Sequence, residues 1–235
     1  MFLKDLFGKA LVDYQSGNYT EDLVTYTNIS EEDDLPIPYL FRNFSNMPKI
    51  EQKALQLAKG TVLDVGCGAG SHSLYLQNKG LLVKGIDISA GAIEVARKRG
   101  VKNVQQKALL DETETFDTIL LLMNGTGIFQ ELAHVSAYLK HITSLLKPNG
   151  QVLIDSSDIK YMYEDEDGGF WIDTQANYYG ELDYYLSYKG EEENPMKWLY
   201  LDFDTLKLAC ETLGLSCQKI LDGPHFDYLA KLTKL

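Results

Sequence analysis

Three glycines at alternating positions are the feature of this sequence best suited to chemistry: Gly66, Gly68 and Gly70. They follow the short apolar run at residues 61–65 and precede a segment with helical spacing. Because glycine has no Cβ, Gly66 and Gly68 allow a tight turn and let a ligand lie against the backbone. Gly70 would allow close packing at the start of the helix, where free N–H groups and the helix dipole can receive a carboxylate or a phosphate.

A carboxylate, Asp87, stands at the end of the next predicted strand, seventeen residues after Gly70. In this position it can accept hydrogen bonds from both hydroxyl groups of a ribose. The glycine loop and Asp87 together indicate a ligand of the adenosine type at the carboxyl edge of a sheet.

Short apolar runs alternate with helical patterns around these residues. The predicted strands are residues 61–65, 81–86, 101–106, 116–123 and 151–155, and the helices between them are residues 71–79, 90–99 and 132–146. Such alternation predicts a parallel sheet with helices on both faces. The pattern returns near the end of the chain, with a helix at 204–213 and closing strands at 216–221 and 227–233.

The remaining segments differ in character, and they divide the chain into four parts. Residues 1–60 show helical spacing around a polar stretch at 30–34, which predicts a helical extension packed on or over the core at 61–155. Residues 156–203 hold eight of the fifteen tyrosines together with Trp171 and Trp198, and they predict an antiparallel β insertion that caps the core or extends its sheet. Residues 204–235 return to the core.

Taken together, these residues resemble the class I methyltransferases that depend on S-adenosylmethionine (SAM). Asp64 through Gly70 match the first motif of that family and Asp87 the second, while Phe116 and Asp117 match the start of its fourth strand. The resemblance implies an α/β, Rossmann-like fold: a seven-stranded, mostly parallel sheet with an antiparallel last strand, helices on both faces and a β-rich insertion. It also implies SAM as the cofactor and methyl transfer as the reaction.

The resemblance further implies which residues contact SAM. The backbone at the three glycines would line its methionine and ribose portions, Asp87 would hold the ribose, and Ile88 would flank the adenine. Asp64 would lie near the methionine amino group, and Asn124, in the loop after the fourth strand, near the methionine end. The family often has an acidic residue after the third strand; this chain has none there, so Leu109 or the backbone would make the adenine contact.

Other candidates also have structural alternatives. His72 begins the helix after the glycine loop and is a further SAM contact or a packing residue. Arg42 could pair with the methionine carboxylate or form an ordinary ion pair. His225, at the turn into the last strand, is the candidate catalytic residue or a loop histidine. The tyrosines of the insertion could enclose an apolar or cationic acceptor, or they could be half-buried strand residues.

Composition limits the class of acceptor. With 34 acidic and 22 basic residues, the formal net charge is −12, which disfavours nucleic acid and anionic membranes and leaves a small-molecule acceptor. The three cysteines have neither disulfide nor zinc spacing, so we expect no metal and a cytoplasmic setting. No apolar run approaches the roughly 18 residues of a membrane span. The sequence gives no indication of the oligomeric state.

Two other functions stay open at this point. An oxidoreductase that uses NAD(P) would have a similar loop, although its usual glycine spacing, G-x-G-x-x-G, is absent here. A regulatory protein that binds SAM or a nucleotide without turnover would have the same motifs as an enzyme.

Overall fold

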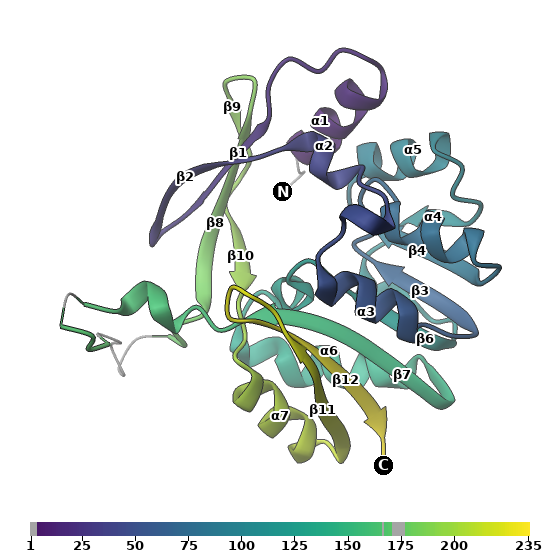
Figure 1. Ribbon diagram of the computed structural model, residues 1–235, viewed down its shortest axis with the longest axis vertical. Coiled ribbons are helices and arrows are strands. Elements are labelled where there is room, and N and C mark those ends of the chain that lie inside the picture. Colours follow the sequence, from purple (N-terminus) through teal and green to yellow (C-terminus); the bar gives the residue numbers. More distant parts are fainter. Residues whose placement is uncertain (1–3, 166, 171–176) are drawn as a thin grey trace.

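The computed structural model describes residues 4–165, 167–170 and 177–235 (Figure 1). Trp171, which the sequence assigned to the insertion, lies outside these residues. The chain forms two sheets with helices around them.

The larger sheet has seven strands in the order β11-β12-β7-β6-β3-β4-β5. Five strands are mutually parallel: β3 (Thr61–Val65), β4 (Leu82–Asp87), β5 (Val104–Gln106), β6 (Phe116–Leu121) and β7 (Leu146–Ser157). Strand β12 (Asp227–Lys234) is antiparallel to β7 and to β11 (Leu215–Asp222). This confirms the predicted Rossmann-like sheet and its antiparallel last strand.

Helices cover both faces of this sheet because successive strand residues point to opposite faces and both are apolar. Ile119 packs in the cluster that holds α6 (Val135–Ser144) and α7 (Phe203–Thr212). The adjacent Leu120 packs in the cluster that holds α3 (Lys49–Leu57) and α4 (Ser71–Asn78). Helix α5 (Ala90–Lys98) packs near β5.

Several boundaries differ from the sequence prediction, among them that of the third strand, which begins at Val104 rather than at residue 101. The segment predicted as one helix at 132–146 is a 3₁₀ turn at Leu132–His134 followed by α6. Strand β7 then begins at Leu146 rather than at residue 151, with Asn149 in a left-handed conformation at φ 60°. The Pro-Asn-Gly sequence therefore bends the start of a strand and does not separate a helix from it.

The smaller sheet is antiparallel and joins the two segments that flank the core (Figure 1). Its order is β10-β8-β1-β2, with β10 at Met196–Leu199, β8 at Glu181–Tyr188, β1 at Leu23–Thr27, β2 at Ser30–Leu35 and the short β9 (Glu191–Glu192) beside β8. The prediction that the extension is helical is therefore only partly right. Residues 23–35 form a hairpin, and the polar stretch at 30–34 lies in its edge strand. The pairing of β1 with β8 supplies the stability that local sequence does not signal.

The helical part of the extension packs on the core beside the glycine loop. It comprises α1 (Leu6–Gln15), the short α2 (Ile37–Leu40) and α3. Helix α1 crosses α5 so closely that a Cβ on Gly91 would lie 2.5 Å from the carbonyl carbon of Gly8. Asp5 accepts the N–H of Gly91 over 2.9 Å and that of Gly8 over 3.2 Å, which fixes this crossing.

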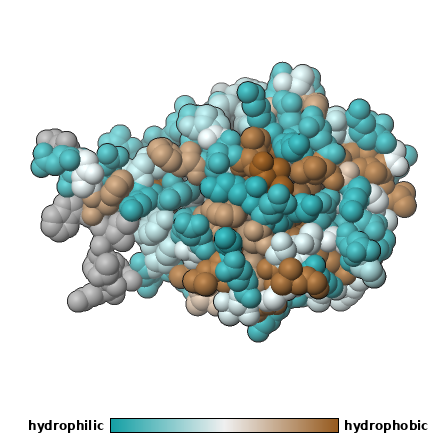
Figure 2. Space-filling view, turned by 60° about the horizontal axis from the view of Figure 1, so that its bottom comes forward, coloured by the Kyte–Doolittle hydropathy of each residue, from teal (hydrophilic) through white to brown (hydrophobic). Residues whose placement is uncertain are grey.

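The surface in Figure 2 is mostly hydrophilic, with hydrophobic side chains in separate patches. None of the described helices has both the length and the apolar character needed to cross a membrane.

Candidate functional site

The glycine loop connects β3 to α4, and all three of its glycines have positive φ angles. The loop turns over the end of β4, where the N–H groups of Gly66 and Cys67 both donate to the carbonyl of Ile86. A Cβ on Gly66 would lie 3.6 Å from Ile128, and a Cβ on Gly68 would lie 3.8 Å from Phe7 of α1. Apart from the adjoining residues, no atom stands nearer, and these are ordinary van der Waals distances. A Cβ would therefore fit at both positions, and their backbone is open in this sense.

Asp87 ends β4 directly beside this loop. Its Oδ2 accepts the N–H of Gly68 over 2.9 Å, and its Oδ1 accepts the N–H of Ser89, also over 2.9 Å. Burial raises the pKa of Asp87 above its ordinary value, although these two bonds oppose the rise. The carboxylate therefore lies at the carboxyl edge of the sheet with its remaining lone pairs free to accept further hydrogen bonds.

Gly70 has a different role from the other two glycines. A Cβ at this position would lie 2.7 Å from Val101 and 3.2 Å from Ala96. Close packing at the start of α4, as the sequence suggested, is what requires glycine here.

A buried ionic cluster lies behind the loop. The carboxylate of Glu51 accepts from the guanidinium of Arg42 and, over 2.6 Å, from Nε2 of His72. Asp64 accepts from the hydroxyl of Ser73 over 2.6 Å. Burial disfavours the charge on His72, but Glu51 and Asp64 outweigh it, so the pKa of His72 lies above its ordinary value. His72 is thus paired with Glu51 through Nε2.

Among the described residues of this cluster, Arg42 is the one with a buried side-chain donor that has no partner. It is 7% exposed, its Nη1 donates to the carbonyl of Tyr39 over 2.6 Å, and its guanidinium lies 3.8 Å from the ring centre of Tyr39. Its Nε is buried and has no hydrogen-bond partner among the described residues. A buried donor without a partner is unfavourable by about 1–3 kcal/mol, which a bound acceptor would relieve.

The expected adenine contacts divide into one exposed and one buried residue. Ile88 is 57% exposed at the edge of the sheet. Leu109 was expected at the edge of the sheet, but its side chain is 5% exposed and belongs to the main core cluster. The next residue, Leu110, is 50% exposed. The short 3₁₀ turn at Leu109–Asp111 turns Leu109 inward and Leu110 outward.

The loop after β6 is held by side chains from β7. Met123 and Asn124 both have positive φ angles, 67° and 58°, which is strained for residues other than glycine. The side chain of Asn124 accepts from Ser156 over 2.9 Å and donates to the carbonyl of Leu199 over 3.3 Å. Asn124 therefore ties this loop to β10, and its amide is already bonded within the protein.

Asp155, which sequence reasoning missed, anchors the same loop. It accepts the N–H of Met123 over 3.0 Å and the N–H of Gly125 over 2.9 Å. The available signal was a lone carboxylate directly after the buried run at residues 152–154.

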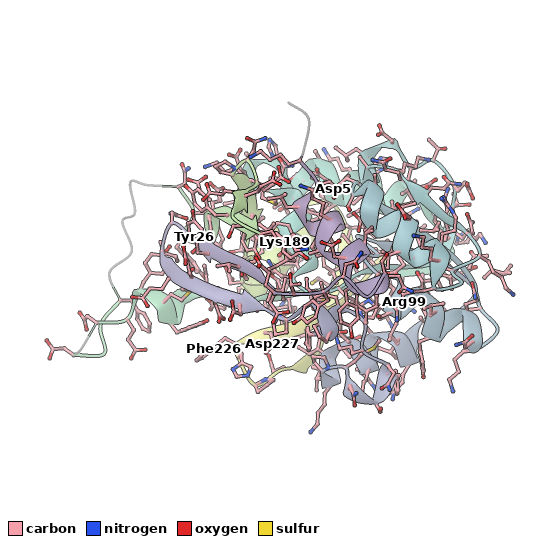
Figure 3. The ribbon with its side chains drawn as sticks, turned by 90° about the horizontal axis from the view of Figure 1, so that it is seen from above. Asp5, Tyr26, Arg99, Lys189, Phe226 and Asp227 are labelled. Carbon is pink, nitrogen blue, oxygen red and sulfur yellow. The ribbon has the colours of Figure 1, made fainter. Side chains whose placement is uncertain are left out.

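Arg99, which follows α5, forms hydrogen bonds to both the glycine loop and the extension. Its guanidinium donates to the carbonyl of Ala69 over 2.6 Å and to that of Phe41 over 3.2 Å. Figure 3 shows Arg99 and Asp5 on the side of the molecule where α1 meets α5, and Tyr26 in the second sheet on the other side. The loop is thus fixed on both sides, by Asp87 and by Arg99.

His225 lies apart from this group of residues. It is exposed in the turn between β11 and β12, next to Phe226 and Asp227 (Figure 3), and its backbone N–H donates to Asp227 over 2.9 Å. A cleft of about 440 Å³ adjoins this turn, with lining residues that include Asp158, Asp202 and Phe226. In the sheet order this turn lies beyond β7, three strands from the glycine loop.

Comparison with known proteins decides the family. Residues 39–218 match the family described as a methyltransferase domain. A solved SAM-dependent methyltransferase from Bacteroides fragilis, in complex with S-adenosyl-L-homocysteine (SAH), is 43% identical in sequence, with a TM-score of 0.92 over 98% of this chain and 95% of that one. This chain belongs to the SAM-dependent methyltransferases.

Other relatives of this methyltransferase are more distant. The ubiquinone biosynthesis O-methyltransferase of Histophilus somni is 32% identical over 121 residues, which cover 46% of this chain and 49% of that protein. The match thus spans about half the length of such curated relatives. A sugar N-methyltransferase from Streptoalloteichus is 13% identical, with a TM-score of 0.55 over 79% of this chain and 85% of that one, and it shows only that the fold is shared.

The residues of this methyltransferase fit the cofactor of its family. Open backbone at Gly66 and Gly68 leaves room for a ligand, Asp87 offers carboxylate oxygens beside it, and the buried Nε of Arg42 lacks an acceptor. The hypothesis of an NAD(P) oxidoreductase does not fit the family and is set aside.

Proposed function

We propose that this methyltransferase transfers the methyl group of SAM to a small-molecule acceptor. The bond between Gly68 and Asp87 carries the proposal, because it sets a carboxylate beside open glycine backbone at the carboxyl edge of the sheet. When bound, SAM supplies an electrophilic methyl group on a sulfonium. The protein has to orient that group and exclude water from it.

The donor half of the site would lie over β3, β4 and β5. In this proposal Asp87 accepts from the ribose hydroxyls, and the backbone of Gly66 and Gly68 lines the ribose and methionine portions. Ile88 and Leu110, both exposed at the edge, flank the adenine. Leu110 takes the place that was expected for Leu109.

The methionine end would face the buried cluster. In this proposal Asp64 attracts the methionine ammonium, and the Nε of Arg42, which has no partner among the described residues, donates to the carboxylate. Gly70 and His72 support this end from behind, Gly70 by close packing and His72 through Glu51. Asn124 acts indirectly, because its side chain holds the loop after β6.

A small acceptor agrees with the segments that lie over the carboxyl edge of the larger sheet. The extension and the second sheet both lie on that side of the core (Figure 1), and Trp198 of β10 packs directly on Gly127 of the loop after β6. The net charge of −12 disfavours a polyanionic acceptor. The three cysteines are free thiols, which agrees with the cytoplasmic setting that we propose.

The test is a search for turnover. The protein would be incubated with SAM and a panel of small amines, phenols, alcohols and carboxylic acids, and SAH and methylated product would be followed by mass spectrometry. We expect SAH release that depends on one class of acceptor. Binding of SAH without methylation across the panel would instead support a regulatory protein that binds SAM.

A further inference from the structure

Asp155 is a buried carboxylate without a cationic partner. It is 8% exposed, and among the described residues its two oxygens accept only the N–H groups of Met123 and Gly125. Within the described part of the chain, no lysine, arginine or histidine forms an ion pair with it. Burying a carboxylate in this way is unfavourable unless a cation or further donors compensate.

Groups on the neighbouring helices do not neutralise this charge. The charge of Glu51 on α3 raises the pKa of Asp155, and the charge of His72 on α4 lowers it. The charge of Asp155 in turn raises the pKa of Tyr39 on α2. Burial raises the pKa of Asp155 to about 7, against the two N–H bonds that lower it. The carboxylate can therefore take up and release a proton near neutral pH.

The sheet order places Asp155 in the acceptor half of the site. The glycine loop follows β3 and Asp87 ends β4, so the donor half lies over these strands, and β6 and β7 come next on the other side of β3. Methyl transfer requires the acceptor opposite the sulfur, in line with the methyl group. Asp155 lies near the carboxyl end of β7 and accepts the N–H of Met123, whose side chain is 39% exposed, so it is on the side of the sheet where the acceptor is expected.

An aromatic ring from the second sheet packs on the same loop, and other aromatic rings lie near it. The indole of Trp198 packs on Gly127, and the ring centre of Tyr184 lies 5.6 Å from that of Trp198. Tyr200 follows β10, and burial, with Tyr184 nearby, raises its pKa to about 12, so its ring stays neutral. Neutral aromatic faces attract organic cations.

We propose that the methyl acceptor is an amine and that Asp155 takes the proton that its nitrogen gives up. The ammonium form would supply the missing cation beside Asp155, and the aromatic rings would surround it. This inference rests on the proposed function, and it assigns the substrate class and a catalytic residue to the same site.

The step balances in atoms and charge. The ammonium passes one proton to the carboxylate of Asp155, which frees the nitrogen lone pair. That lone pair forms the new N–C bond as the C–S bond breaks, and sulfur keeps the electron pair of the broken bond. The methylated nitrogen carries the positive charge away, and Asp155 releases its proton to water.

The test compares matched amines and alcohols as binding probes for the SAH-loaded protein. The pairs are benzylamine with benzyl alcohol, tyramine with tyrosol, and cyclohexylamine with cyclohexanol, each titrated by calorimetry. In at least one pair we expect the amine to bind about tenfold more tightly, which corresponds to about 1.4 kcal/mol. Equal or weaker binding of the amine in all three pairs would overturn the inference.

Substitutions connect the preference to Asp155. Asp155→Asn should abolish it, whereas Asp204→Asn, which removes the same charge from an exposed position on α7, should leave it unchanged. A preference that survives in Asp155→Asn would contradict the role of this carboxylate. Failure of SAH to bind the unaltered protein would instead refute the proposed function.

A second measurement covers the case in which Asp155→Asn does not fold. In the unaltered protein, the preference for the amine should fall as the pH is lowered from about 8 to about 6, because Asp155 becomes protonated while the alkyl amines stay charged. A preference that is constant over this range would contradict the assignment.

Discussion

The backbone N–H of Gly68 donates to Oδ2 of Asp87 over 2.9 Å, which joins the loop after β3 to the end of β4. The bond requires the left-handed conformation of Gly68, at φ 51°, and it brings a carboxylate alongside open backbone. Two motifs that are nineteen residues apart in sequence thereby become one binding surface.

Gly68→Ala should weaken SAM binding much more than it weakens folding. The left-handed backbone makes alanine unfavourable by about 1–2 kcal/mol, and the new Cβ would stand in the space proposed for the cofactor. Gly80→Ala is the matched control, since Gly80 has φ 87° with open space around it at the end of α4. Urea unfolding should show similar losses of stability in the two variants. Calorimetry should show a loss of SAM affinity in Gly68→Ala and none in Gly80→Ala. Equal affinities in the two variants would contradict the site.

Glu51→Gln should destabilise the fold strongly. It leaves Arg42 and His72 buried without their carboxylate, and breaking a buried ion pair in this way typically lowers the free energy of unfolding by about 3–5 kcal/mol. Glu94→Gln, which removes an exposed pair with Lys98, should lower it by less than about 1 kcal/mol. Both values come from urea unfolding, and similar small losses in the two variants would show that the cluster is not important for stability.

The contribution of His72 should depend on pH. Its pKa in the folded protein is raised, so the stability that it adds is fully present below its ordinary pKa of 6.5 and is lost as the pH rises through the folded value. The difference in stability between the unaltered protein and His72→Gln should therefore be larger at about pH 6 than at about pH 9. A difference that grows with pH would mean that His72 is buried neutral.

Glu193→Gln should loosen α1. The buried carboxylate of Glu193 accepts the N–H groups of Lys4 and Leu6, over 2.9 Å and 3.1 Å, and so joins the insertion to the first turn of α1. We expect a loss of about 1–2 kcal/mol and faster hydrogen exchange in α1. Glu191→Gln, which removes only an exposed pair with Lys9, should leave this exchange unchanged. Unchanged exchange in Glu193→Gln would show that other contacts hold α1.

The central part of the fold was predictable because its signals are local. The apolar run of β3, the three glycines and the carboxylate of Asp87 each appear within a few residues, and each has a direct structural reason. The hairpin of β1 and β2 gave no such signal. Four acidic residues at 31–34 are unusual in a strand, and they are tolerated because β2 is an exposed edge strand. It pairs with β1, which in turn pairs with β8, about 150 residues away in the sequence.

The candidate site residues show the same limit of sequence-based prediction. Whether Leu109 or Leu110 faces outward depends on a single 3₁₀ turn. Asn124 was expected at the cofactor, but contacts with Ser156 and Leu199 from distant segments hold its side chain. Asp155 became a candidate only when the fold placed it beside the loop after β6. Sequence reasoning could place residues whose geometry is set locally, and it could not place those whose surroundings depend on long-range contacts. Which of these residues contact SAM stays a prediction.

The most direct test of the account is calorimetric titration with SAM and SAH, with NAD as the control ligand, on the unaltered protein and on Asp87→Ala. We predict micromolar binding of both SAM and SAH, no binding of NAD, and a loss of affinity of at least about tenfold in folded Asp87→Ala. Unchanged affinity in that variant would contradict the proposed site, and a folded protein that binds neither SAM nor SAH would contradict the function.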